Sequence, residues 1–140
     1  MPKFGKASLE RRALLCKDLR RLLDEVIKKY DFSIIESFRD KSVQERYYNN
    51  GSSKAHFGES AHNYNPSFAF DFAPWPCPKK QVNGVVQIDS DSPEWQIAVN
   101  IFKQTAKELN ISIICGADFK SFKDLMHIEL ADWRKRVKNI

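Results

Sequence analysis

Apolar residues recur every three or four positions along two long stretches of the chain, which predicts two amphipathic helices. Ser8 is a candidate N-cap for the first helix, whose pattern runs to about Tyr30. Ser92 precedes Pro93, a residue type favoured at the first helical position, and the second pattern ends near Asn110.

Short runs rich in Phe, Ile and Val lie between the helical stretches and predict β-strands. The expected strands cover residues 32–37, 68–72, 111–114 and 125–130. Asn83-Gly84, which lies between apolar residues, is typical of a tight hairpin. A short helix is expected over residues 40–48, and a polar loop over residues 51–67. This order predicts an α+β fold in which a small antiparallel sheet packs against helices.

Length and composition limit the classes of protein to which this chain can belong. The chain has 140 residues, of which 42% are hydrophobic, so we expect a single domain over residues 1–140. No apolar run approaches the roughly 20 residues that a membrane-spanning helix needs, and residues 1–10 lack the apolar region of a secretory signal. The three cysteines lie far apart, which argues against a disulfide framework and a cysteine-rich zinc knuckle.

The formal net charge of +5 favours polyanionic partners such as nucleic acid, anionic lipid or an anionic cell wall. Ordinary solubility explains the same charge equally well. The basic residues 134–138 are expected to form a solvated tail. The three tryptophans, Trp75, Trp95 and Trp133, are expected at core or rim positions in preference to sugar-stacking platforms.

Histidine and aspartate residues suggest a metal site. Asp71 lies in the apolar run of residues 68–73 and needs a partner, because burial of an unpaired carboxylate is costly. His62 precedes this run, and Asp124 lies three residues before His127. Two imidazoles and one carboxylate would leave a fourth position open, which is the catalytic form of a zinc site. From residue types alone, ordinary loop and cap residues explain these positions as well.

Four motifs occur in a fixed order between residues 9 and 130. They are Ser37-Phe38-Arg39 followed by Gln44, Ser60-Ala61-His62 followed by Ala69-Phe70-Asp71, the stretch from Gly116 to Phe122, and Asp124-Leu125-Met126-His127. Together they resemble the D-Ala-D-Ala carboxypeptidase-like zinc peptidases, also called LAS or VanY-like, and among these the phage endolysins that are L-alanyl-D-glutamate peptidases. Two details depart from the pattern. The interval from His62 to Asp71 is nine residues where seven is common, and Ala117 and Phe119 replace the usual Gly and Trp.

The resemblance implies a Hedgehog/D-Ala-D-Ala peptidase-like fold and a role for each motif residue. His62, Asp71 and His127 would be the ligands of Zn²⁺. Asp124 would be the general base, and Arg39 would stabilise the oxyanion. Two further residues are expected around this set. Ser60 would support a ligand or contact the substrate, and Glu129, on the same strand face as His127, would orient a ligand or meet solvent. His56 is expected outside the site.

The leading hypothesis is therefore a monomeric, single-domain zinc endopeptidase of the phage endolysin type. It would cleave the L-Ala–D-Glu bond of bacterial peptidoglycan for host cell lysis, with no nucleic-acid partner and no membrane insertion. It would stay in the host cytoplasm until a holin-type pore released it to the periplasm and cell wall. The alternatives are a D-Ala-D-Ala carboxypeptidase or dipeptidase and, from another class, a basic nucleic-acid-binding domain without a metal.

Overall fold

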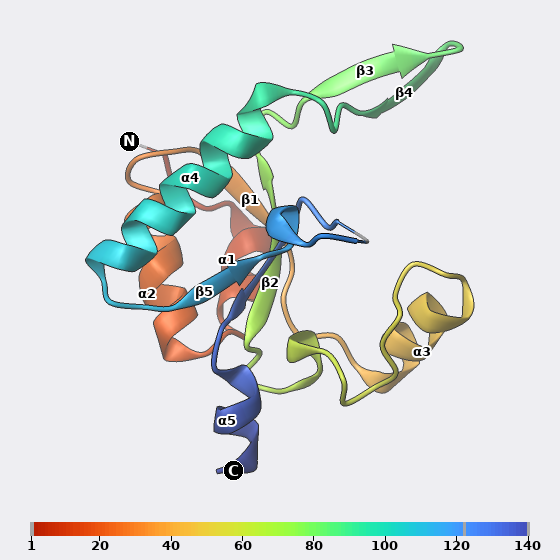
Figure 1. The fold of residues 1–140 in the computed structure, drawn as a ribbon. Coiled ribbons are helices and arrows are strands. Elements are labelled where there is room, and N and C mark those ends of the chain that lie inside the picture. The colour runs from red at the N-terminus through yellow and green to blue at the C-terminus, as the bar shows by residue number, and fades with distance from the viewer. Residues whose placement is uncertain (1, 122, 140) are drawn as a thin grey trace.

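A four-stranded antiparallel sheet forms the centre of the molecule, and helices cover one of its faces (Figure 1). The computed structural model describes residues 2–121 and 123–139. The helices are α1 (Lys6–Arg12), α2 (Lys17–Val26), α3 (Lys41–Asn49), α4 (Pro93–Glu108), α5 (Trp133–Lys138) and the 3-10 turns η1 (Ala61–Asn63) and η2 (Gly116–Asp118). The strands are β1 (Phe32–Glu36), β2 (Ala69–Pro74), β3 (Lys79–Val82), β4 (Val85–Ile88), β5 (Ile113–Cys115) and β6 (His127–Leu130). The predicted α+β fold with a small antiparallel sheet is confirmed.

Strand order in the main sheet is β1-β2-β6-β5, and every neighbouring pair is antiparallel. Because successive side chains of a strand point to opposite faces, β2 directs Phe70 and Phe72 to one face and Asp71 to the other. The phenylalanines pack against Phe102 of α4, with ring centroids 5.6 and 4.9 Å away. We call the helix-covered face the inner face and the face that carries Asp71 the outer face.

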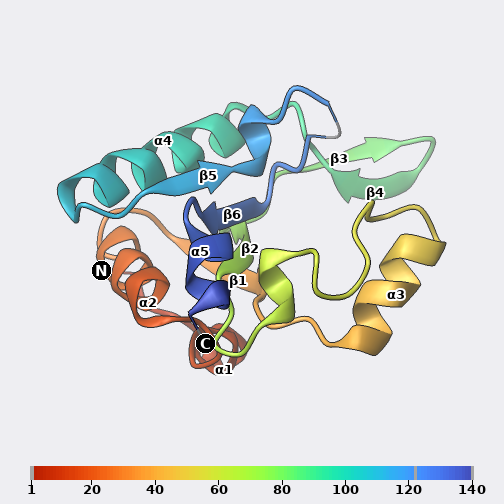
Figure 2. The ribbon, with the colours of Figure 1, turned by 60° about the horizontal axis from the view of Figure 1, so that its bottom comes forward.

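The outer face lies on the side of the sheet where α3 and its following loop stand. Figures 1 and 2 show α2 and α3 on opposite sides of β2. The strands β3 and β4 form a separate hairpin that projects from the end of β2 (Figure 1). Asn83 and Gly84 have φ values of 51° and 78°, which is the left-handed conformation that a two-residue hairpin turn needs, as predicted.

The single long helix expected from Ser8 to Tyr30 is wrong, because the chain forms two helices there. Between them, the Cys16 N–H donates to the Ser67 carbonyl at 3.0 Å, and the Ser67 N–H donates to the Leu14 carbonyl at 2.8 Å. These tertiary hydrogen bonds replace helical ones at the break. Ser8 is also no N-cap: it is buried, and its hydroxyl accepts a hydrogen bond from the Ile34 N–H at 3.0 Å.

Two further boundaries differ from the sequence expectation. The last strand begins at His127, because the preceding residues form a turn in which the His127 N–H donates to the Asp124 carbonyl at 3.2 Å. The expected solvated tail is the helix α5, which Trp133 anchors with only 4% of its surface exposed. Among the helices that the structure describes, none has the length and apolar character to cross a membrane.

Candidate metal centre and active site

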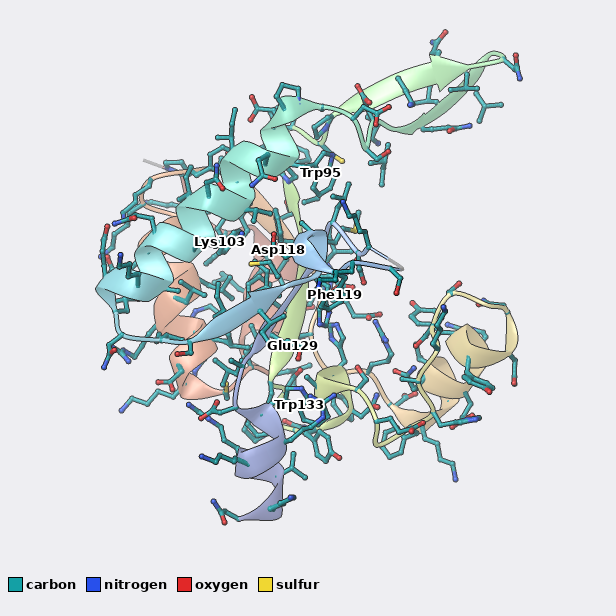
Figure 3. All side chains as sticks on the ribbon, in the orientation of Figure 1. Trp95, Lys103, Asp118, Phe119, Glu129 and Trp133 are labelled. Atoms are coloured by element: carbon teal, nitrogen blue, oxygen red, sulfur yellow. The ribbon has the colours of Figure 1, made fainter. Side chains whose placement is uncertain are left out.

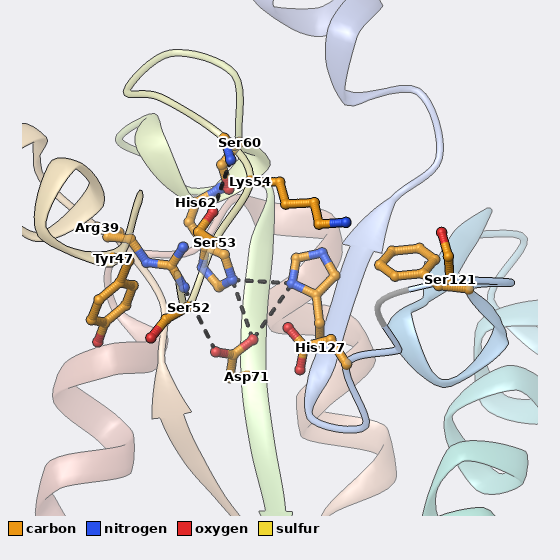
Figure 4. A pocket seen from close by; sticks show the side chains of 13 residues that line it. Arg39, Tyr47, Ser52, Ser53, Lys54, Ser60, His62, Asp71, Ser121 and His127 are labelled. Carbon is orange, nitrogen blue, oxygen red and sulfur yellow. Dashed lines mark hydrogen bonds and ion pairs between the residues drawn. The ribbon is translucent and has the colours of Figure 1, made fainter. Parts of the chain in front are cut away.

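Three potential ligand atoms meet on the outer face of the sheet (Figure 4). Asp71 and His127 are directly opposite each other on β2 and β6, and His62 reaches them from η1. His62 Nε2 lies 3.2 Å from Asp71 Oδ1 and 3.1 Å from His127 Nδ1. His127 Nδ1 lies 3.5 Å from Asp71 Oδ1. The structure therefore brings together the three residues proposed as ligands.

The other nitrogen of each histidine ring is already bonded. His62 Nδ1 lies 2.7 Å from the Ser37 carbonyl, to which it donates, so Nε2 is the ring nitrogen that faces the centre. His127 Nε2 lies 2.7 Å from Glu129 Oε1, and the Trp133 indole donates to the second carboxylate oxygen at 2.9 Å. Figure 3 labels Glu129 on β6 and Trp133 at the start of α5. Such contacts hold a metal-binding imidazole in one orientation.

The electrostatics of the centre favour a positive charge. Burial acts to raise the pKa of Asp71, but hydrogen bonds from His127 and His62 outweigh it and hold that pKa well below its usual range. Burial acts to lower the pKa of His127, but hydrogen bonds to Asp71 and Glu129 outweigh it and raise the pKa to about 9. A divalent cation can supply the same positive charge, and the two imidazoles and one carboxylate are ligands that zinc accepts. These residues therefore fit a metal ion.

Asp124 lies at the same pocket, on the turn before β6. Burial is the main cause that raises the pKa of Asp124, and the negative charge of Asp71 adds to it. Its backbone N–H donates to the Gly116 carbonyl at 3.1 Å. A Cβ atom at Gly116 would lie 2.2 Å from the Asp124 carbonyl oxygen and 3.0 Å from His127 Cβ, so only glycine fits there.

Arg39 faces the centre from the end of β1. Its guanidinium donates to Glu36, through Nε at 2.7 Å and also through a second nitrogen, and lies 3.9 Å from Asp71 Oδ2. A further nitrogen donates to the buried Gln44 at 3.0 Å. The ring of Tyr47 packs against it, 4.7 Å from Cζ. Arg39 is therefore fixed in place before any substrate binds.

Ser60 is the N-cap of the 3-10 turn η1, which carries His62. Its hydroxyl accepts from the His62 N–H at 3.2 Å, as an N-cap that helps to place His62. The two additional residues between His62 and Asp71 are accommodated in the loop before β2, where Ser67 pairs with the break between α1 and α2. Asp71 therefore still lies opposite His127.

One pocket of about 530 Å³ contains these groups. Its lining residues are Arg39, Tyr47, Ser52, Ser53, Lys54, Ala55, Ser60, His62, Asp71, Phe119, Ser121, Asp124 and His127. Glu129 does not line the pocket but contacts His127 from behind. His56 lies outside it and pairs with Glu45 at 3.0 Å. The last residue of the 116–122 motif, Phe122, lies outside the described residues.

Sequence reasoning missed three contributors to the site. Trp133 is buried, as a core or rim position predicts, but its indole also donates to Glu129, and its position only four residues after Glu129 is the available signal. Ser37 acts through its backbone carbonyl, for which a sequence carries no signal. Lys54 belongs to a polar loop whose path toward the pocket only the tertiary fold reveals.

Comparison with known proteins identifies the family. A family model described as phage L-alanyl-D-glutamate peptidase matches residues 1–132. Among solved structures, the Serratia marcescens L-Ala D-Glu endopeptidase ChiX has a TM-score of 0.74 and 24% sequence identity, covering 95% of this chain and 93% of that chain. This likeness shows a shared fold, and no curated protein matches the sequence. The chain belongs to the family of phage L-alanyl-D-glutamate peptidases.

Proposed function

We propose that this protein is a zinc-dependent endopeptidase that hydrolyses the L-Ala–D-Glu bond in the stem peptide of bacterial peptidoglycan. Membership of the peptidase family supports the reaction class. One observation carries the assignment of the site. Ligand atoms of His62, Asp71 and His127 lie within 4.8 Å of one another in a pocket that also holds Asp124 and Arg39.

His62, Asp71 and His127 would hold the zinc ion, which when bound lowers the pKa of a water molecule to about 7. Asp124 accepts the proton of the attacking water and passes it to the leaving amine. Its raised pKa, caused first by burial, suits both steps because a general base works best with a pKa near the working pH. Arg39 directs its charge at the oxyanion that develops on the scissile carbonyl, and Glu36 and Gln44 hold it for that task.

The test compares Asp124→Asn with Asp118→Asn on purified peptidoglycan. Asp118 is a matched control because it lies on the adjacent turn, pairs with Lys103 at 2.7 Å and is absent from the pocket lining. We expect Asp124→Asn to retain its metal and lose a factor of about 10² to 10⁴ in kcat, the usual contribution of a general base. Asp118→Asn should retain activity. An active Asp124→Asn enzyme would contradict the role of Asp124.

The products identify the bond. Mass spectrometry of the released fragments should find new N-terminal D-Glu. Free D-Ala instead would indicate a D-Ala-D-Ala carboxypeptidase. Metal analysis of the wild-type chain beside His127→Ala should give about one zinc per chain, lost in the variant. Absence of zinc from both after reconstitution would overturn the metal site.

The same proposal treats residues 1–140 as one catalytic domain that acts as a monomer. It is supported by the hydrophobic core that residues 2–121 and 123–139 form, which places the ligand atoms of His62, Asp71 and His127 together. Light scattering should give the mass of one chain. For release to the cell wall we propose a holin-type pore, so expression inside a bacterium should cause lysis only when such a pore is co-expressed.

A further inference from the structure

A second cavity lies on the outer face of the sheet, beside the catalytic pocket. It has a volume of about 260 Å³, and the base of the β3–β4 hairpin forms one of its walls. The side chains that line it are mainly apolar. They include Ile35, Ala73, Trp75, Ile88 and Met126, which we call the apolar patch.

The exposure of Trp75 distinguishes the apolar patch from the hydrophobic core. Trp95 and Trp133 are 2% and 4% exposed, whereas Trp75 is 63% exposed. Ile35 and Ile88 are also exposed, at 41% and 43%. An indole and two large aliphatic side chains on one face of a small protein are typical of a binding surface, because packing within the fold does not require them there.

The patch is continuous with the metal centre along two chain segments. Ala73 follows Asp71 by two residues and faces the same side of β2, about 7 Å further along the strand. Met126 precedes His127, and its carbonyl accepts from the Phe72 N–H at 3.0 Å. A molecule bound at the catalytic pocket therefore meets the patch as soon as it extends past Asp71 along β2.

We propose that the apolar patch binds the glycan strand of peptidoglycan, with Trp75 stacked on a sugar ring. This inference rests on the proposed function. The scissile L-Ala–D-Glu bond is only one amino acid away from the muramic acid to which the stem peptide is joined. One residue and the lactyl link span about 7 Å when extended, which places the muramic acid beside Ala73 at the near edge of the patch, so that the glycan strand continues over Trp75 two residues further on.

The distribution of charge along the substrate determines which of its ends faces the apolar patch. The muramic acid carboxyl is uncharged because it forms the amide with L-Ala, so the sugar side of the substrate is neutral and suits an apolar surface. The D-Glu side carries free carboxylates. The catalytic pocket, which Ser52, Ser53 and Lys54 also line, offers hydroxyls and an ammonium group to it.

The experiment measures kcat/KM for two substrates, a disaccharide carrying the stem peptide and the same peptide without sugar. It uses the wild type, Trp75→Ala and Ile97→Ala. Ile97 is a control because it is an exposed apolar side chain, at 44%, that lies on the helix α4 and is absent from the cavity lining. The wild type should prefer the glycan-bearing substrate, and Trp75→Ala should lower this preference about tenfold, which corresponds to about 60 Å² of apolar contact. Ile97→Ala should leave the preference unchanged.

A binding measurement with glycan strands whose muramic acid carboxyls carry a simple amide in place of the peptide gives a readout that does not depend on hydrolysis. Intrinsic fluorescence should shift on glycan addition in the wild type and not in Trp75→Ala, because the other two tryptophans are buried. An unchanged substrate preference in Trp75→Ala, or equal glycan binding by both proteins, would overturn the glycan surface. Failure of the wild type to cleave intact peptidoglycan would instead overturn the proposed function.

Discussion

At the scale of single residues, Gly116 is the position where the site leaves no room for a side chain. We expect Gly116→Ala to destabilise the protein by about 1–3 kcal/mol, because the new Cβ forces the Asp124 carbonyl and the His127 Cβ away from residue 116. The same shift should weaken metal binding. Urea unfolding and zinc titration measure the two effects.

Gly5→Ala is the matched control. Gly5 has a φ of −76°, and a Cβ atom there would meet nothing within 4 Å. Gly5 is the N-cap of α1, where alanine is less favourable, so this variant should lose at most about 1 kcal/mol and keep the zinc affinity of the wild type. Wild-type stability and zinc affinity in Gly116→Ala would show that the turn adapts, which would contradict the tight packing between Gly116 and Asp124.

The charged residues of the site could be predicted from the sequence. Most of the residues that contact and orient them could not. His62, Asp71 and His127 were recognised through motifs that resemble those of the peptidase family, because residue types alone fitted ordinary loop and cap residues as well. Their packing partners follow from the tertiary fold. The motif around Gly116 was recognisable in the sequence. The close approach of Asp124, which leaves no room for a side chain at Gly116, was not.

At the scale of elements, α5 positions the metal centre through a hydrogen-bond chain from Trp133 to Glu129 to His127. Trp133→Phe keeps the aromatic ring but removes the indole N–H. We expect zinc affinity to fall about 10- to 100-fold, as is usual when a residue that orients a ligand is lost. Competition with a fluorescent chelator measures the affinity directly.

Trp95→Phe is the control for this change. Trp95 is equally buried and donates to the Asp89 carbonyl at 2.9 Å, away from the pocket. Both variants lose one indole hydrogen bond and should lose similar stability. Only Trp133→Phe should bind zinc more weakly, and equal affinities in the two variants would refute the positioning role.

A second element-scale prediction concerns the attachment of α5 to α2. Asp18 accepts from Arg136 at 2.7 Å, and this hydrogen bond is the main cause that lowers the pKa of Asp18. A lowered folded-state pKa adds stability above the unfolded pKa, and that stability is lost as pH falls through the folded pKa. Asp18→Asn should therefore cost about 0.5–1 kcal/mol at pH 7 in urea unfolding.

The difference between wild type and Asp18→Asn should shrink steadily as the pH is lowered below 4. A difference that is constant with pH would mean that the ion pair does not stabilise the fold. The attachment itself explains a failed sequence expectation. Residues 134–138 read as a solvated basic tail because nothing local shows that Arg136 reaches a helix 118 residues away.

Other errors in the predicted helices and strands also arise from contacts between residues that are distant in sequence. The periodic pattern through residues 8–30 is helical in character, yet hydrogen bonds to Ser67 interrupt it. Local capping was predicted correctly in two of the helices. Ser92 and Asp40 accept hydrogen bonds from Glu94 and Val43 as N-caps, whereas Ser8, also a candidate N-cap, bonds to the distant Ile34 N–H.

At the scale of the whole molecule, the metal centre connects parts of the chain that are distant in sequence. His62, Asp71 and His127 come from η1, β2 and β6, so an ion bound by all three binds only the folded state tightly. A ligand present at 1,000 times its dissociation constant stabilises the folded state by about 4 kcal/mol. For a domain of this size, that corresponds to a rise in Tm of about 10–15 °C.

Calorimetry of the metal-free chain with and without zinc should detect this rise, and excess chelator should reverse it. His127→Ala corrects for effects on the fold, because each protein is compared with itself in the presence and absence of zinc. The variant lacks one of the three ligands, so its Tm should respond little to zinc. An equal rise in Tm in both proteins would mean that zinc binds elsewhere. The effect of zinc on stability would then give no support to a catalytic role for this centre.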